Sequence, residues 1–144
     1  MVKVKSLEVF ASCHATEDLD KVKKAMLNIV PKELREKVVF EEKTLKGHYG
    51  NPIVRLSFKL KGLDAEKTLR YIAESLDEIS KRLLGASLSL RVEMPKLYLR
   101  FSKQEAFFGR IILEDSDDIV KVVISFSTKR TESLEQYLKE LGLI

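Results

Sequence analysis

The stretch Val54-Arg55-Leu56-Ser57-Phe58-Lys59-Leu60-Lys61, residues 54–61, alternates apolar and polar side chains without interruption. Successive side chains of a strand point to opposite faces, so a period of two predicts a strand that is buried on one face only. The apolar set belongs to a core, and the basic residues Arg55, Lys59 and Lys61 belong to the opposite face. Such a strand is typical of a sheet that carries helices on one side and leaves the other side partly open.

Other segments of the chain show the same strand pattern. We expect further strands at residues 3–13, 38–45, 96–101, 110–113 and 119–126. The last two predict a hairpin across the acidic loop 114–118. Because the strands come mostly in neighbouring pairs, antiparallel pairing should dominate.

Apolar residues at helical spacing predict helices between these strands. Thr16 is a suitable N-cap for a first helix, which should stop before Pro31. A long second helix should begin at Asp64, which can cap it. Its apolar stripe consists of Ala65, Leu69, Ile72, Ala73, Leu76, Ile79 and Leu83. Residues 85–94 fit either a continuing helix or a strand, and the pattern leaves both open.

Two shorter signals complete the expected elements. Ser102 and Glu105 match a capping box, which predicts a short helical turn through Phe107 that ends at Gly109. The chain closes with an amphipathic helix ended by Gly142. Together these elements predict an α+β fold, a single domain over residues 1–144 with a mostly antiparallel sheet and helices packed on one face.

Composition excludes several classes of protein. Hydrophobic residues make up 44% of the 144, enough for a packed core, so a disordered chain is excluded. No apolar run approaches the roughly 20 residues of a membrane span, and the N-terminus alternates instead of forming a signal-peptide block. With one cysteine we expect a cytoplasmic protein. Two Asn, two Gln and 33% charged residues are typical of a heat-adapted, thermophilic protein.

Positive charge is concentrated in the first part of the chain. The net charge is +4, but residues 1–62 hold 13 Lys and Arg against 8 Asp and Glu. This distribution favours a polyanionic partner, with a solvated basic surface as the alternative.

The residues that could carry catalysis or bind metal do not form a recognisable site. Cys13 and His14 are neighbours on a strand and point to opposite faces, so with His48 they form no metal-ligand pattern. Asp115, Asp117 and Asp118 could bind a cation such as Mg²⁺, but a solvated hairpin tip explains them as well. Nucleophile elbows and nucleotide-binding glycine loops are absent from the sequence. We therefore expect no cofactor, no bound metal and no enzymatic activity.

A cluster of basic, aromatic and amide side chains lies in and beside the strand at residues 54–61. Phosphates need Lys and Arg, and exposed bases need an aromatic face and polar edges, so this mixture is typical of RNA recognition. A solvated strand face with a structural turn is an equally simple explanation. The candidate residues are Lys43, Lys46, His48, Tyr49, Asn51, Arg55, Lys59 and Lys61, extended by Arg100 if its strand lies beside that face.

Lys103 and Gln104 form a second candidate cluster. They stand at the first turn of the predicted short helix, where free backbone N–H groups attract anions. Phosphate contact and simple solvent exposure both fit this position.

Four segments together resemble a known family. They are His14-Ala15-Thr16-Glu17-Asp18, Gly47-His48-Tyr49-Gly50-Asn51-Pro52-Ile53, Leu97-Tyr98-Leu99-Arg100-Phe101-Ser102-Lys103-Gln104 and Asp117-Asp118-Ile119-Val120. The chain is similar to an archaeal family of small predicted RNA-binding proteins, often described as exosome-associated. The resemblance implies an α+β fold similar to the ribosomal large-subunit protein that contacts its small RNA. It also implies a role in RNA processing, and it supplies no catalytic residues.

Sequence and resemblance together predict a non-catalytic RNA-binding protein of the archaeal cytoplasm. Its partners would be RNA and exosome or other ribonucleoprotein subunits, with no membrane. The rival hypothesis is an adaptor that docks on an RNA-processing complex without touching RNA, and a third is an RNA nuclease or modifying enzyme. The oligomeric state stays open, a homodimer included.

Overall fold

The sheet has six strands, all paired antiparallel, in the order β2-β3-β1-β6-β5-β4. The computed structural model describes the backbone of residues 1–144 and every side chain except that of His48. The strands are β1 (Val4–Cys13), β2 (Glu41–Lys46), β3 (Pro52–Lys61), β4 (Val92–Glu93), β5 (Lys96–Ser102) and β6 (Ile119–Phe126). The alternating stretch at residues 54–61 is β3, one strand in from the β2 edge.

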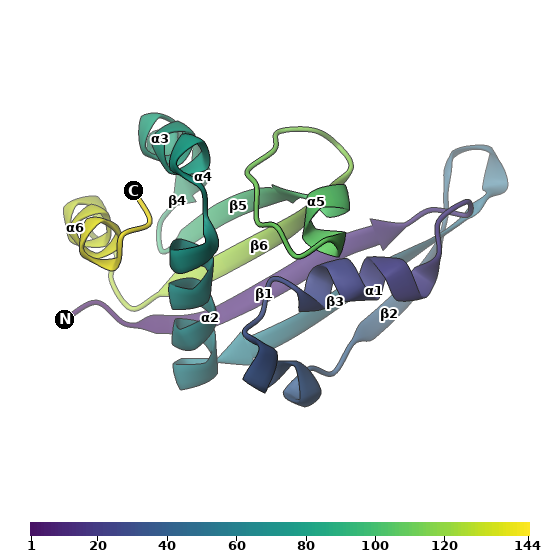
Figure 1. Ribbon diagram of the computed structural model, residues 1–144, viewed down its shortest axis with the longest axis horizontal. Helices are drawn as coiled ribbons and strands as arrows, with labels where there is room; N and C mark the ends of the chain where they lie inside the picture. Colours follow the sequence, from purple (N-terminus) through teal and green to yellow (C-terminus); the bar gives the residue numbers. More distant parts are fainter.

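Helices lie on one face of this sheet, the face toward the viewer in Figure 1. They are α1 (Leu19–Leu27), α2 (Gly62–Ser75), α3 (Glu78–Ala86), α4 (Leu88–Arg91), α5 (Lys103–Phe107) and α6 (Thr131–Leu141), with short 3-10 turns η1 (Lys32–Lys37) and η2 (His48–Gly50). This arrangement confirms the predicted α+β class and the single helical layer. No helix among the described residues has the length and apolar run that crossing a membrane requires.

The core lies between the sheet and the helices. On β3, Leu56, Phe58 and Leu60 are buried, while Arg55 and Lys59 between them are exposed. The same alternation continues on the neighbouring strands. The inward side chains include Leu7, Val9 and Ala11 on β1, Val120, Val122 and Ile124 on β6, and Leu97, Leu99 and Phe101 on β5.

The predicted long helix is wrong at its start and in its second half. It begins at Gly62 without a side-chain cap, so Asp64 does not cap it. The chain extends at Leu76, and a new helix, α3, begins after Asp77. This break resets the helical phase, so Ser80 and Leu84 are buried, whereas Ile79 and Leu83 of the predicted stripe are exposed. Leu76 itself is buried, so a core contact holds the turn between the two helices.

The ambiguous segment 85–94 is mostly helical. It contains the end of α3, the short helix α4 and then the two-residue strand β4. β4 pairs with the start of β5 and forms the far edge of the sheet.

Two local predictions are corrected. Asp18, and not Thr16, caps α1, because its carboxylate accepts hydrogen bonds from the backbone N–H groups of Asp20 and Lys21. Residues 110–113 form no hairpin with β6, which pairs with β1 and β5 instead. Only an isolated bridge joins Leu113 to Phe101.

Two helix ends follow the sequence signals. The Ser102 side chain accepts a hydrogen bond from the Glu105 backbone N–H, as a capping residue does. The expected stops at Gly109 and Gly142 both have positive φ, 82° and 85°.

Candidate nucleic-acid interface

The side of the sheet away from the helices is rich in cations, and we call it the open face. Residues directly opposite each other in an antiparallel pair share a face. Lys43 is opposite Arg55, Arg55 is opposite Ser12, and Ser57 is opposite Phe10. From β2 to β5, the open face consists of Glu41, Lys43, Leu45, Ile53, Arg55, Ser57, Lys59, Lys61, Ser6, Glu8, Phe10, Ser12, Ile119, Lys121, Val123, Ser125, Lys96, Tyr98, Arg100 and Ser102.

The structure confirms the predicted exposure of the basic strand face. Arg55, Lys59 and Lys61 are all exposed, and no helix covers them. Among the side chains that the structure describes, none of the three has an acidic partner within 4.0 Å. Their charges are therefore available to a ligand.

Like charges face each other across neighbouring strands at two places on the open face. Lys43 on β2 is opposite Arg55 on β3, and Lys121 on β6 is opposite Arg100 on β5. Side chains directly opposite on one face have Cβ atoms about 5 Å apart, and like charges there destabilise the sheet. An anion bound between them would remove this repulsion.

Arg100 lies on the open face, but its strand, β5, is not beside β3, so the condition set for including Arg100 is not met. Two strands, β1 and β6, separate β5 from β3. The basic surface therefore extends across the width of the sheet. Arg100 donates a hydrogen bond to the backbone carbonyl of Ser116, which fixes one end of its guanidinium.

Two residues that were not predicted from the sequence, Lys121 and Phe10, lie on the central strands of the open face. Their positions alternate with the buried Val120, Val122 and Val9, so the alternation within each strand already indicated that Lys121 and Phe10 point away from the core. What the sequence did not supply was the strand order that places β1 and β6 between β3 and β5. The ammonium of Lys121 lies 5.4 Å from the centre of the Phe10 ring.

The turn between β2 and β3 extends beyond the end of the sheet (Figure 1). Its ends are tied by the Gly47 N–H, which donates to the Asn51 carbonyl at 2.6 Å. Gly50 has φ of 80°, in the left-handed region that favours glycine. Tyr49 is 95% exposed, and Lys46 and Asn51 are exposed as well. The side chain of His48 lies outside the part that the structure describes.

Lys103 lies in the interior, a position that neither solvent exposure nor direct phosphate contact would predict. Its side chain is 6% exposed. The ammonium donates to the Ser12 carbonyl at 2.8 Å, to both carboxylate oxygens of Glu17 at 3.1 Å, and contacts Asp118 Oδ1 at 2.6 Å. Gln104 is exposed and borders a hollow between α1 and α5 on the helix side.

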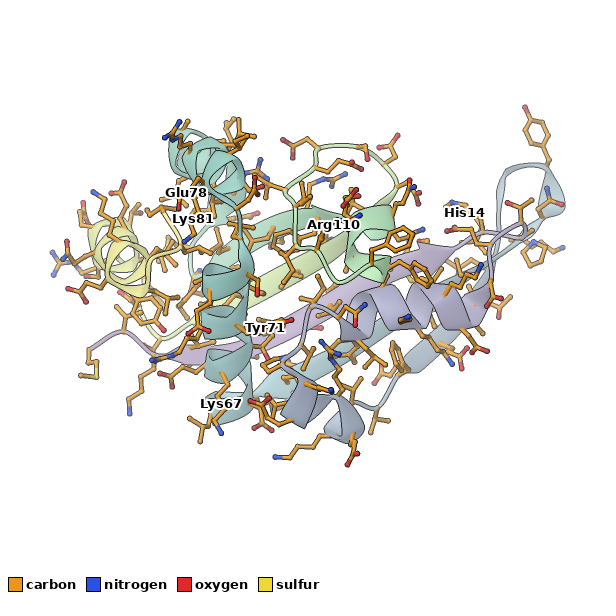
Figure 2. All side chains as sticks on the ribbon, in the orientation of Figure 1. His14, Lys67, Tyr71, Glu78, Lys81 and Arg110 are labelled. Carbon is orange, nitrogen blue, oxygen red and sulfur yellow. The ribbon has the colours of Figure 1, made fainter. Side chains whose placement is uncertain are left out.

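Glu17 is held in its charged form by the same cluster. Burial raises the pKa of this carboxyl, but hydrogen bonds from the His14 backbone N–H, the His14 ring and Lys103 outweigh burial and leave the pKa below its usual value. His14 Nδ1 lies 2.7 Å from Glu17 Oε1. Figure 2 places His14 at the end of β1, beside the β2–β3 turn.

The ligand atoms of His14, Glu17 and Asp118 lie within 4.8 Å of one another, close enough to share a metal ion. The Lys103 ammonium contacts both carboxylates, so these acids already hold a cation. Cys13 is buried, and burial together with Glu17 raises the pKa of its thiol, which keeps it protonated. The cluster is therefore an internal ion-pair network that joins β1, α5 and the start of β6.

The acids of the loop 114–118 are solvent-exposed, as expected, but the loop is not a hairpin tip and two of its acids are paired. Asp115 pairs with Arg91 at 3.0 Å, and Asp118 pairs with Lys103. Both cations are buried, so the loop is tied to the body of the protein at two points.

The chain resembles archaeal proteins along most of its length. An uncharacterised protein of Methanocaldococcus jannaschii, MJ0213, is 34% identical over 139 residues, which cover 94% of this chain and 93% of that protein. The RNA-binding protein PAB1135 of Pyrococcus abyssi is 32% identical over 114 residues, which cover 77% of this chain and 74% of that protein.

Solved structures have the same fold. The crystal structure of the DUF54 protein AF2318 from Archaeoglobus fulgidus superimposes with a TM-score of 0.81 at 29% identity, covering 96% of this chain and 99% of that one. A family model described as RNA binding matches residues 6–126, from β1 to the end of β6. This chain therefore belongs to that RNA-binding family.

Proposed function

We propose that this protein binds RNA through the open face of its sheet and that it does so without catalysing a reaction. Family membership and a relative named as an RNA-binding protein support the ligand class. The composition of the open face supports its assignment as the RNA-binding surface, because exposed cations lie there together with the half-buried rings of Phe10 and Tyr98. The proposed contacts are Lys43, Lys46, Tyr49, Asn51, Arg55, Lys59, Lys61, Arg100 and Lys121.

The observation that carries this proposal is the placement of like charges directly opposite each other on neighbouring strands. Lys43 is opposite Arg55, and Arg100 is opposite Lys121. Like charges in such positions are destabilising in a sheet. A polyanion compensates for both at once, since each phosphate contact neutralises a cation and releases counterions. On a merely solvated surface, only mobile salt ions screen this repulsion.

Lys103 is not among the proposed direct contacts, because its ammonium is enclosed by Glu17, Asp118 and the Ser12 carbonyl. We assign it a structural role in holding the loop 114–118 against the sheet. Arg100 bonds to Ser116 of that loop, so the network supports one of the proposed phosphate contacts.

We further propose that the RNA is a substrate or component of an RNA-processing or ribonucleoprotein assembly, with the exosome as the leading candidate. The resemblance of the sequence to exosome-associated proteins supports this partner. Recovery of the tagged protein from native archaeal extract, with and without nuclease, tests it. Co-purification of RNA-processing subunits supports it, and their absence from both samples contradicts it.

Charge reversal on β3 tests direct RNA binding. We expect the double variant Arg55→Glu, Lys59→Glu to keep its fold, because exposed substitutions usually cost within about 0.5 kcal/mol. RNA affinity should fall for every sequence tested, since phosphate contacts carry no base identity. The slope of log K against log salt should drop by roughly 0.7 for each single-strand phosphate that the variant no longer neutralises.

The matched control reverses two charges on the helix side. Lys67 on α2 and Lys81 on α3 lie away from the open face (Figure 2). The variant Lys67→Glu, Lys81→Glu changes net charge by the same amount. Equal loss of RNA affinity in both double variants would contradict an interface on the open face.

Exposed apolar side chains on the helix side favour a second function, docking of a protein partner. Ile79 is 68% exposed and Leu83 and Leu90 are also exposed, on α3 and α4. This is the adaptor hypothesis, in which RNA contact is absent. It predicts weak RNA affinity in the wild type and loss of a protein partner on Ile79→Glu, Leu83→Glu.

A further inference from the structure

A hollow of about 440 Å³ opens in the open face where β1 ends and β6 begins. Its volume falls in the range of about 300–1,000 Å³ that is usual for small-ligand sites. Its lining comes from four strands and the loop before β6. The lining includes Phe10, Ser12, Arg55, Arg100, Asp117 and Lys121.

Three cations surround this hollow. Arg55 stands on one side of β1, and Lys121 and Arg100 stand on the other side. Among the described side chains, none of the three has an acidic partner within 4.0 Å. A guanidinium has five N–H donors, so the Arg100 bond to Ser116 leaves donors for a phosphate.

The charge of this hollow distinguishes it from a larger one. A hollow of about 850 Å³ lies between the N-terminus and α6, and its lining includes Glu66, Glu132 and Glu140. Three carboxylates repel phosphate. The hollow on the open face is lined by Asp117 and Asp118, but Asp118 is paired with Lys103. The remaining cations of its lining outnumber Asp117, so this hollow is the better site for an anion.

Phe10 supplies an aromatic surface at the same place. Its ring is half-buried in the open face, and the Lys121 ammonium lies 5.4 Å from the ring centre. A cation over a ring gains about 0.5–1 kcal/mol at exposed sites. A phosphate competes well for that cation, and movement of Lys121 toward it would uncover the ring for a base.

The wall of the hollow is held in place. Lys103 lines it and is anchored to the Ser12 carbonyl, Glu17 and Asp118. This network joins the end of β1 to the loop before β6. Asp117 lines the hollow on the loop side, so phosphate is directed toward the three cations on the strands.

We infer that this hollow receives one unstacked nucleotide of single-stranded RNA. Its phosphate is held by Arg55, Arg100 and Lys121, and its base lies against the Phe10 ring. The inference rests on the proposed RNA-binding function and adds the strandedness of the ligand and the position of one nucleotide. Bases in a duplex are already stacked, so they cannot reach a ring recessed in a sheet.

The test compares a 20-nucleotide oligouridine strand with the same strand paired to oligoadenine, at one salt concentration. Charge alone favours the duplex, because its phosphates are more closely spaced. We expect the full-length protein to bind the single strand at least tenfold more tightly. Phe10→Leu should weaken single-strand binding about tenfold, as expected for the loss of one stacked base, and should leave duplex binding unchanged.

Phe108→Leu is the matched control. Phe108 is an exposed ring at the end of α5, on the helix side, and its loss should leave single-strand binding unchanged.

A second measurement uses the wild-type protein and needs no variant. Uridine 5′-monophosphate added to the wild type should shift the backbone amide NMR signals of Phe10, Ser12, Arg55 and Arg100.

The outcomes separate this inference from the proposed function. Equal or tighter duplex binding overturns the inference and leaves RNA binding by the open face standing. Nucleotide-induced shifts confined to other surfaces, or equal losses in the Phe10 and Phe108 variants, overturn it as well. Failure to bind either RNA overturns the proposed function itself.

Discussion

Lys103 shows how one buried cation can organise a site that it does not enter. Its ammonium joins β1, α1 and the start of β6 through Ser12, Glu17 and Asp118. We expect Lys103→Met to lower the free energy of unfolding by about 2 kcal/mol, the scale of lost hydrogen bonds to a charged group. Urea denaturation measures this. Gln104→Met is the control at the next, exposed position, and an equal loss there would contradict the role of the ammonium.

Glu17 makes the same network sensitive to acid. Its pKa is lowered in the folded protein, because the hydrogen bonds from His14 and Lys103 outweigh burial. A carboxyl with a lowered folded pKa stabilises the protein fully above its unfolded pKa, near 4.5, and this contribution is lost as pH falls through the folded pKa. Unfolding measured from pH 6 to pH 3 should therefore show falling stability. Glu17→Gln should be less stable at pH 6 and show a weaker dependence on pH below about 4.5, and an unchanged pH profile would contradict this assignment.

At the scale of elements, the β2–β3 turn depends on its two glycines for different reasons. Gly50 has φ of 80° and nothing within 4 Å of an added Cβ, so substitution there costs backbone strain alone. Gly50→Val should lower stability by about 1 kcal/mol or more, whereas Gly50→Asn should cost less, because Asn tolerates the left-handed region. Thermal unfolding compares the two. Equal costs would show that the left-handed conformation is not what the turn requires.

At Gly47, neighbouring atoms leave no room for a side chain. A Cβ there would lie 2.7 Å from the Asn51 carbonyl oxygen, the acceptor that closes the turn. Gly47→Ala should therefore cost stability even though its φ is negative. Thermal unfolding measures this loss of stability, and heteronuclear NMR of the variant should show chemical-shift changes confined to the residues of the turn. If Gly47→Ala is as stable as the wild type, the backbone of the turn can move aside and the close approach is not essential.

The elements that could be predicted from sequence are those whose signal is local. The period of two at residues 54–61, the Ser102 cap and the stop at Gly142 all depend on a few neighbouring residues, and the structure confirms them. The break at Leu76 has no such signal, because neither Gly nor Pro marks it and a core contact decides it. Strand order is also a tertiary property, which is why Lys121 could be placed on a strand but not beside Arg100.

At the scale of the whole molecule, the sheet has one face built for stability and one face that carries repelling cations. Binding sites are often retained at a cost in stability. Lys43 and Arg55 on the edge pair β2–β3 isolate this effect, because both are exposed and directly opposite. Lysine on an edge strand also discourages aggregation. A useful variant must therefore keep a charge at that edge.

Lys43→Glu meets that condition and converts a repelling pair into an attracting one. We expect the free energy of unfolding to rise by about 0.5 kcal/mol, the scale of a cross-strand charge pair, while RNA affinity falls. The gain in stability should vanish in 1 M salt, where the Debye length is about 3 Å. Lys67→Glu on the helix side is the control and should change neither quantity. Lower stability of Lys43→Glu, or unchanged RNA affinity, would contradict a role of the Lys43–Arg55 pair in binding a polyanion. Protection of the sheet edge against aggregation would then be the remaining reason for a charge at Lys43.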